Sequence, residues 1–283
     1  MAEAGEALRQ ALVAEARAWL GTPYRHQAAL RGVGCDCLGL VRGVWRAVHG
    51  AEPEPVPEPV RTMTRPLSPT ELERHRIVVR SGKGDNIDLF RMLRTKVIQQ
   101  MESANLRTLA ITSPQYGDGK TTIAINLAMS LAMDVKQTVL LVDMDMRKPS
   151  VHEFLGIEPQ VGLSDYLLRN VPLSDSLLKP NIDRLVVLPV AGSLQESSEL
   201  LGTPKMVRLA AELKSRYPDR IVIYDMPPLL TQDDTLGFLP QVDGVLLVVR
   251  DGVSPIAQVR ACAESLAGRN FLGTILNDSR FTV

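Results

Sequence analysis

Six short apolar segments recur between residue 105 and the end of the chain, and they constrain the fold more than any other feature. They are rich in β-branched residues and apolar almost without interruption, as expected of parallel strands covered on both faces. Helix-like stretches such as "KTTIAINLAMSLAMD" and "PIAQVRACAESLAG" separate them. We expect strands within 108–113, 138–145, 184–191, 220–227, 244–252 and 272–278. This alternation predicts an α/β fold with a doubly wound, mostly parallel sheet.

The sequence changes character at "AEPEPVPEPV", residues 51–60. Its prolines favour extended geometry and exclude a helix, which indicates a linker. Upstream, "ALRQALVAEARAWLG" has the apolar spacing of a helix. Downstream, "SPTELERHRIVV" opens with the serine, proline and acids that begin helices. We predict a small helical fragment at 1–50, a linker at 51–65 and the α/β domain at 66–283.

Composition narrows the function classes. Lys+Arg and Asp+Glu both number 32, so no global field favours nucleic acid or an anionic membrane. Aromatic residues make up 4%, which argues against base-stacking platforms. The three cysteines form no disulfide framework, and the sequence shows neither a signal peptide nor an apolar run of roughly 20 residues. We expect a soluble, cytoplasmic chain that does not bind nucleic acid.

Polar and acidic side chains gather where the predicted strands end. They are Ser113, Asp143, Asp145, Asp225 and Asn277. Ligands of open parallel sheets bind at the carboxyl edge of the strands. This edge is therefore the predicted functional site.

The first of these strand ends continues into "SPQYGDGKTT", residues 113–122, which contains most of a phosphate-binding loop. Gly117 and Gly119 would let backbone N–H groups turn inward, and the following helix would add its positive end. Lys120 would reach the terminal phosphates and the Thr121 hydroxyl would ligate Mg²⁺. Pro114 replaces the usual first glycine, which is tolerable in extended backbone. A glycine-rich turn before a helix would explain the glycines but not "GKTT".

Three carboxylates are expected beside this loop. Asp143 and Asp145 stand two residues apart at one strand end, and Asp225 ends another in "RIVIYDMPP". Each alone has the ordinary alternative of a helix cap or a surface carboxylate. Together they would surround a Mg²⁺–phosphate cluster, because Mg²⁺ prefers hard oxygen ligands.

Three motifs in order, "PQYGDGKTT", "LLVDMDMR" and "VIYDMP", closely resemble the Walker motifs of the bacterial tyrosine kinases of capsular and exopolysaccharide synthesis. These are the CpsD/CapB-like group of the MinD-related P-loop NTPases, and the resemblance covers roughly residues 66–279. MinD- and ParA-type relatives usually carry an additional lysine where this chain has Gln115. Its absence favours the kinase branch over a MinD/ParA-like ATPase switch, which stays the alternative.

The resemblance implies an ATP-dependent protein-tyrosine kinase that uses Mg²⁺. It assigns nucleotide binding to Gly117, Asp118, Gly119, Lys120, Thr121, Thr122 and Asn277, the last reading the adenine edge. Metal binding falls to Thr121, Asp145 and Asp225. Catalysis falls to Lys120, Asp143, Asp145 and Arg147, with Asp143 accepting the tyrosine proton. Arg147 would neutralise phosphate charge or hold a neighbouring acid.

The family's partners are also implied. Its kinases work with a membrane-spanning chain-length regulator, here a separate chain that would recruit this one to the inner face of the membrane. In "DLFRMLRTKV", Asp88, Arg91 and Arg94 match a helix used for ring-like self-association, although the pattern is ordinary for a solvated helix face. The family's tyrosine-rich tail is missing after "NDSRFTV", so we expect a tyrosine substrate on another protein.

The N-terminal fragment resembles a different family. "GTPYRH" and "GCDCLGLV" are similar to the start of NlpC-type cysteine peptidases, with Cys37 at the nucleophile's position. The family's histidine comes from a downstream half with no counterpart here. The lone C-x-C of Cys35 and Cys37 is a weak metal signal. We interpret residues 8–58 as a truncated peptidase start and expect no peptidase activity.

Overall fold

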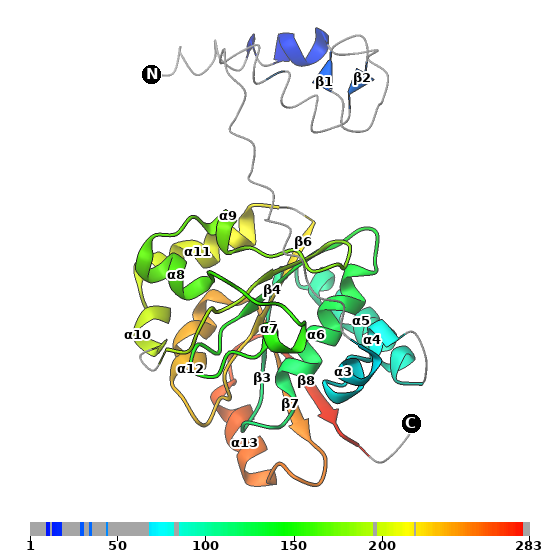
Figure 1. Cartoon of the computed structure of the whole chain (residues 1–283), viewed down its shortest axis with the longest axis vertical. Coiled ribbons are helices and arrows are strands. Elements are labelled where there is room, and N and C mark those ends of the chain that lie inside the picture. Colours follow the sequence, from blue (N-terminus) through cyan, green and yellow to red (C-terminus); the bar gives the residue numbers. More distant parts are fainter. Residues whose placement is uncertain are drawn as a thin grey trace. The chain divides into compact units, whose positions relative to one another are not determined.

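The chain divides into two compact units, Met1–Glu58 and Pro59–Val283, in a computed structural model of the protein (Figure 1). The structure describes residues 68–81, 85–194, 197–217 and 219–279. Nearer the N-terminus it describes residues 10, 11, 13–18, 29, 30, 34, 35 and 44.

The first unit is helical at residues 13–18 and contains a short strand pair. β1 (Ala29–Leu30) runs antiparallel to β2 (Gly34–Cys35). The sequence predicted only helices here, because two-residue strands are too short to show a period in the sequence. Cys37, the position resembling a peptidase nucleophile, lies outside the described residues, so its role stays a prediction.

The second unit contains the predicted sheet. Its strands are β3 (Thr108–Thr112), β4 (Thr138–Asp143), β5 (Leu185–Leu188), β6 (Arg220–Asp225), β7 (Gly244–Arg250) and β8 (Phe271–Asn277). They are ordered β5-β4-β6-β3-β7-β8, and every neighbouring pair is parallel. The predicted doubly wound α/β fold is confirmed.

Helices cover both faces of this sheet (Figure 1). They are α3 (Pro69–Arg74), α4 (Val78–Ser81), α5 (Asp85–Ser103), α6 (Lys120–Ala132), α7 (Val151–Phe154), α8 (Leu163–Arg169), α9 (Leu173–Ser176), α10 (Ser197–Leu201), α11 (Pro204–Ser215), α12 (Asp234–Phe238) and α13 (Ile256–Ser265). A 3₁₀ turn, η1 (Leu239–Gln241), follows α12.

The strands are apolar throughout because each face packs on its own core. In β4, Val139 and Leu141 join the core formed with α5 and α6, whereas Leu140 and Val142 join the core formed with α8, α11 and α13. All four side chains are fully buried. Each such burial stabilises the fold by roughly 1.5–3 kcal/mol, which explains why the strands lack polar/apolar alternation.

One buried side chain fixes the segment before α5 beside α6. Asn126 Nδ2 donates to the Arg76 carbonyl at 2.9 Å, and its Oδ1 accepts from the Val78 and Val79 N–H groups at 2.9 and 3.2 Å. α3 itself begins with a capping box between Ser68 and Glu71. Asn126 thereby places the end of α3 close to the start of α6, where the phosphate loop ends.

Candidate active site

The loop between β3 and α6 has the backbone geometry that a phosphate loop requires. Gly117 and Gly119 have φ values of 88° and 97°, a left-handed conformation in which glycine is favoured. Helix α6 begins directly afterwards at Lys120. The left-handed glycines and the start of the helix therefore lie side by side in the chain, which is a favourable arrangement for binding an anion.

Asp118 holds this loop in shape. Its Oδ2 accepts the N–H of Gln115 at 2.9 Å, and its Oδ1 accepts the hydroxyl of Ser254, on the turn after β7, at 2.9 Å. The side chain is buried. Asp118 was predicted to bind nucleotide, but its carboxylate is used to close the loop and attach it to the neighbouring turn.

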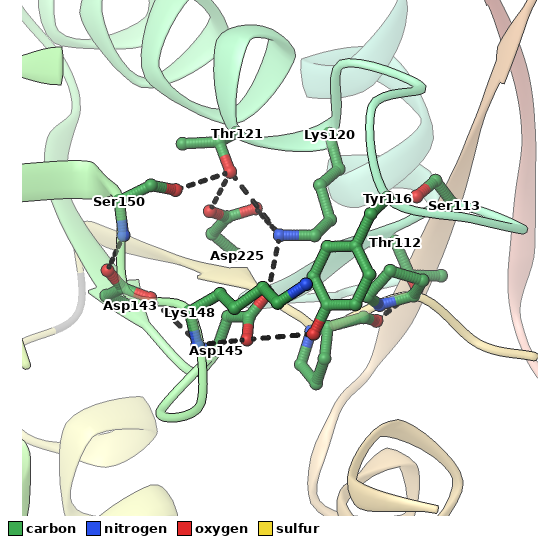
Figure 2. A network of polar contacts seen from close by, with 12 residues as sticks. Thr112, Ser113, Tyr116, Lys120, Thr121, Asp143, Asp145, Lys148, Ser150 and Asp225 are labelled. Carbon is green, nitrogen blue, oxygen red and sulfur yellow. Dashed lines mark hydrogen bonds and ion pairs between the residues drawn. The ribbon is translucent and has the colours of Figure 1, made fainter. Parts of the chain in front are cut away.

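The predicted lysine and carboxylates converge. Lys120 Nζ lies 3.0 Å from Asp145 Oδ2 and 4.0 Å from Asp225 Oδ1. The Thr121 hydroxyl donates to Asp225 Oδ2 at 2.6 Å. Sheet register explains part of this convergence, since Asp143 lies opposite Asp225 on the adjacent strand. Figure 2 shows these groups gathered at the start of α6.

Asp143 is fully buried and is held by backbone N–H groups. Its oxygens accept the N–H groups of Asp145, Ser150 and Val151, each at 3.1 Å. Burial, reinforced by the nearby charge of Asp225, raises the pKa of Asp143 to about 8. A carboxyl group with such a pKa suits proton transfer near neutral pH. In this structure, however, Asp143 serves the backbone and does not line the cavity described below.

The cluster holds three buried carboxyl groups and one buried lysine. Burial raises the pKa of Asp225, although Lys120 and the Thr121 hydroxyl oppose the shift. Burial alone would lower the pKa of Lys120, but the charges of Asp225 and Asp145 outweigh it and raise that pKa. Asp225 Oδ1 accepts no hydrogen bond. A further cation would find an unused carboxylate oxygen here.

Mg²⁺ fits this donor set. The Thr121 hydroxyl and Asp225 are hard oxygen ligands beside the phosphate loop, and the unpartnered Asp225 Oδ1 faces a lysine only at 4.0 Å. The described residues contain no cluster of three or more His, Cys, Asp or Glu that would cage a metal alone. Mg²⁺ at nucleotide sites takes one or two protein ligands and completes its shell with phosphates and water.

A cavity of about 420 Å³ opens over the cluster. It is lined by Arg74, His75, Arg76, Tyr116, Gly117, Gly119, Lys120, Thr121, Thr122, Asp145, Lys148, Ser150, Phe154, Arg250 and Asn277. Of the predicted nucleotide-binding residues, Asp118 alone is absent from this lining. A smaller cavity of about 240 Å³ lies near the amino ends of β3 and β6, and no predicted site residue lines it.

Asn277 reaches the phosphate loop from the end of β8. Its Nδ2 donates to the Asp118 carbonyl at 2.9 Å. Beyond it, Asp278 binds Arg76 at 3.0 Å and Arg250 at 2.9 Å. Sequence reasoning missed both arginines, because only the fold brings the end of α3 next to the ends of β7 and β8.

Arg147 takes the second of its two predicted roles in this structure. Its Nε donates to the Ser197 hydroxyl at 3.0 Å, and its Nη2 lies 3.7 Å from Asp234 Oδ1. Asp234 is buried, and that burial raises its pKa. Arg147 therefore holds a neighbouring acid and ties the loop after β4 to α10 and α12.

Sequence reasoning also missed Tyr116. This residue stands inside the glycine loop and is half-buried. Its hydroxyl lies 3.4 Å from Asp145 Oδ1, and Lys148 Nζ lies 4.2 Å from its ring centroid. Burial and the charge of Asp145 raise the pKa of Tyr116 to about 12. The sequence contained one indication of its importance, because a large aromatic residue directly precedes the glycines of the phosphate loop.

The three residues of α5 that were predicted to mediate assembly make different contacts. Arg91 and Asp88 form an exposed ion pair at 2.8 Å, which leaves both at the surface. Arg94 instead donates to the Ser130 carbonyl at 3.0 Å, within the same unit. Whether α5 mediates self-association stays a prediction.

Comparison with known proteins agrees with this site. The family described as an AAA domain matches residues 106–251, which contain the phosphate loop and all three carboxylates. Tyrosine-protein kinase YwqD of Bacillus subtilis is 32% identical over 215 residues, covering 75% of this chain and 90% of YwqD. The chain belongs to the bacterial tyrosine-protein kinases. Its kinase domain therefore corresponds to nearly the whole of YwqD.

Another relative is much longer than the segment of it that matches this chain. Succinoglycan biosynthesis transport protein ExoP of Rhizobium meliloti is 31% identical over 207 residues, covering 71% of this chain but only 26% of ExoP. The kinase domain thus corresponds to about a quarter of that protein.

Solved structures show the same fold. The chimerical protein CapA2B2 is 31% identical with a TM-score of 0.66, covering 73% of this chain and 90% of that one. The septum site-determining protein MinD from Pyrococcus horikoshii, complexed with Mg-ADP, is 25% identical with a TM-score of 0.52, covering 62% of this chain and 72% of MinD. The kinase domain accordingly shares the P-loop architecture of a magnesium-nucleotide-binding protein.

Proposed function

We propose that this chain is an ATP-dependent protein-tyrosine kinase of capsular or exopolysaccharide synthesis, transferring the γ-phosphate of ATP to a tyrosine. The observation that best supports this proposal is the position of Lys120 at the end of the glycine loop. Its Nζ lies 3.0 Å from Asp145 Oδ2 and 4.0 Å from Asp225 Oδ1. Phosphoryl transfer depends on positioning and charge neutralisation, and this arrangement supplies both.

The nucleotide would occupy the cavity over the loop. Backbone amides around Gly117 and Gly119 would bind the phosphates, with Lys120 neutralising the terminal ones. Thr122 and Asn277 line the same cavity, and Asn277 stands where the resemblance places the adenine-reading residue. Asp118 would contribute by holding the loop closed through its own side chain.

Mg²⁺ would be held by Thr121 and Asp225, with Asp145 beside them. When bound, the ion supplies charge neutralisation at the phosphate oxygens. It would also give the unpartnered oxygen of Asp225 a partner.

The proton of the acceptor tyrosine must reach a carboxylate. The family resemblance implies this role for Asp143, and its pKa of about 8 suits it. The position of Asp145 favours a first contact there, because Asp145 lines the cavity and already lies 3.4 Å from a tyrosine hydroxyl. We propose that the phenol meets Asp145, with Asp143 directly behind it as the alternative base.

We also propose a membrane-spanning regulator on a separate chain as the partner, recruiting this chain to the inner face of the membrane. Support comes from ExoP, a transport protein by name, in which sequence similar to this chain fills only 26% of the length. None of the helices in the described ranges combines the length and apolar character needed to cross a bilayer. Self-association through Asp88 and Arg91 is a further proposal, because both remain exposed.

The amino-terminal assignment stays a proposal as well. Residues 1–50 would be a peptidase-like fragment without peptidase activity, 51–65 a linker and 66–283 the kinase domain. A Cys37→Ala chain should keep its ATP-dependent activity. Loss of that activity would contradict the proposal that the N-terminal fragment takes no part in the kinase reaction.

Incubation with γ-labelled ATP and a random copolymer of glutamate and tyrosine tests the kinase. Label on copolymer tyrosine is expected, and Lys120→Met should abolish it. Lys136→Met is the matched control, because Lys136 is an exposed lysine in the turn after α6. Release of free phosphate without phosphotyrosine, also abolished by Lys120→Met, would instead favour an ATPase switch like MinD.

A further inference from the structure

Three side chains from different parts of the chain, those of Asp145, Gln232 and Lys148, contact Tyr116. Its hydroxyl lies 3.4 Å from Asp145 Oδ1. The Gln232 side-chain amide donates a hydrogen bond to the same hydroxyl. The Lys148 ammonium lies 4.2 Å from the centre of the ring. Figure 2 shows Lys148 and Asp145 reaching the ring and the hydroxyl of Tyr116.

These three contacts together recognise a phenol. An ammonium over the ring face requires an aromatic side chain. An amide donor and a carboxylate acceptor at one oxygen require a hydroxyl. A phenylalanine would leave both polar partners unused, and a serine would offer no ring. The set of contacts is therefore selective for tyrosine.

The bound hydroxyl is also close to the phosphate end of the site. The carboxylate that Tyr116 contacts through Oδ1 binds Lys120 through Oδ2 at 3.0 Å. One carboxylate thus separates a tyrosine oxygen from the lysine assigned to the terminal phosphates. Among the tyrosines that the structure describes, Tyr116 alone lines this cavity. Tyr166 and Tyr217 pack against Lys205 and Arg220 elsewhere.

We propose that Lys148, Gln232 and Asp145 form the subsite for the phenol of the acceptor tyrosine, and that Tyr116 fills this subsite until an acceptor displaces it. This inference rests on the kinase function proposed above. Gln232 is half-buried, and its side-chain amide donates to the Tyr116 hydroxyl, so it would donate in the same way to an acceptor hydroxyl once Tyr116 has left. Lys148 is exposed and can follow a different ring.

The step balances without a further reactant. The acceptor oxygen forms a bond to the γ-phosphorus, the bond from that phosphorus to the β,γ-bridging oxygen breaks, and ADP leaves with the electron pair. The phenolic proton passes to Asp145. Tyr116 must leave before another tyrosine can enter, so its occupancy lowers the apparent affinity for the acceptor.

Steady-state kinetics with the glutamate–tyrosine copolymer and ATP test the subsite. In a Tyr116→Ala background, where no ring competes for the subsite, Lys148→Met should raise the KM for copolymer about 3-fold to 30-fold, the range of a cation–π contact, and change the KM for ATP less. Lys148→Arg should restore the copolymer KM, because a guanidinium also binds a ring face. Gln232→Leu should raise the copolymer KM in the same way.

Tyr116→Ala should lower the KM for copolymer, since the competing ring is gone. Lys136→Met serves as the exposed control and should leave both KM values unchanged. Phosphate found on Tyr116 itself by mass spectrometry would support the subsite, because it shows that a phenol held there reaches the γ-phosphate.

Other outcomes overturn the subsite. In the Tyr116→Ala background, a Lys148→Met change that raises the KM for ATP and leaves the copolymer KM unchanged would assign Lys148 to the nucleotide. A Tyr116→Ala chain with a raised copolymer KM would show that Tyr116 helps the acceptor bind. If the wild-type chain binds ATP but labels no tyrosine at all, the proposed function fails instead, and the two failures are distinguishable.

Discussion

A Cβ atom on Gly119 would lie 2.0 Å from Nδ2 of Asn277, so a side chain at this position would have to displace the Asn277 side chain at the end of β8. Gly119 also has a φ of 97°. Two constraints therefore act on one residue, one from the backbone and one from a strand more than 150 residues further along the chain.

Gly119→Ala should destabilise the domain by about 1–3 kcal/mol, because it combines a steric clash with backbone strain. Nucleotide binding should be lost together with the loop geometry. Gly119→Ala/Asn277→Ala should recover only part of the stability, since the clash is relieved while the strained φ remains. Thermal melts and nucleotide titrations check both variants. Full recovery in the double variant would show that strain at Gly119 is negligible.

Asn substitutions separate the two candidate bases. If Asp145 accepts the tyrosine proton, Asp145→Asn should lower kcat about 100-fold or more, in the range of general-base effects. Asp143→Asn should then mainly disturb the backbone amides that Asp143 holds. If Asp143 is the base, its substitution should also remove a rise of kcat with pH near 8. A pH–rate profile of each variant decides the assignment.

Arg147→Met should cost stability rather than nucleotide affinity. Asp234 is buried, and removing its arginine leaves a carboxyl group with Ser197 as its remaining partner. We expect a loss of about 1–3 kcal/mol, reduced by the partial exposure of the arginine. Asp234→Asn in the same background should restore part of it. Chemical denaturation measures the effect. If the stability is unchanged and kcat falls strongly, Arg147 acts in catalysis, as the family resemblance implied.

Asp243 makes the start of the sheet sensitive to acid. Its carboxylate accepts the N–H groups of Arg107 and Thr108 at 2.9 and 3.1 Å and binds Lys214. Burial alone would raise the pKa of Asp243, but the bond from Lys214 and the backbone N–H bonds outweigh it and lower that pKa. The folded state therefore favours the ionised form.

The lowered pKa of Asp243 determines how its contribution to stability changes with pH. The stabilisation is present above the pKa of the unfolded chain and is lost as pH falls through the folded value. Asp243→Asn should cost about 1–3 kcal/mol at pH 7 and less at pH 3. Urea denaturation at both pH values checks this, with the exposed Asp183→Asn as the matched control. An equal loss at both pH values would contradict the linkage.

Sequence by itself determined the parts of this protein that depend on neighbouring residues. Each strand was visible as an apolar run because both faces of the sheet are covered. The loop glycines, Lys120 and Thr121 belong to one short stretch with a fixed spacing. Asp143 and Asp225 were placed at one edge because parallel strands end together, and the register brings them opposite each other.

Only the tertiary structure decided contacts between segments distant along the chain. Gln232 meets Tyr116 across 116 residues, and Arg76 meets Asp278 across 202. Arg147 pairs with Asp234, and Asp118 accepts a hydrogen bond from Ser254, because the packing of the loops against neighbouring segments sets the rotamers of these side chains. Such contacts leave no period or spacing in the sequence, since they depend on where the crossover connections return the chain to the sheet.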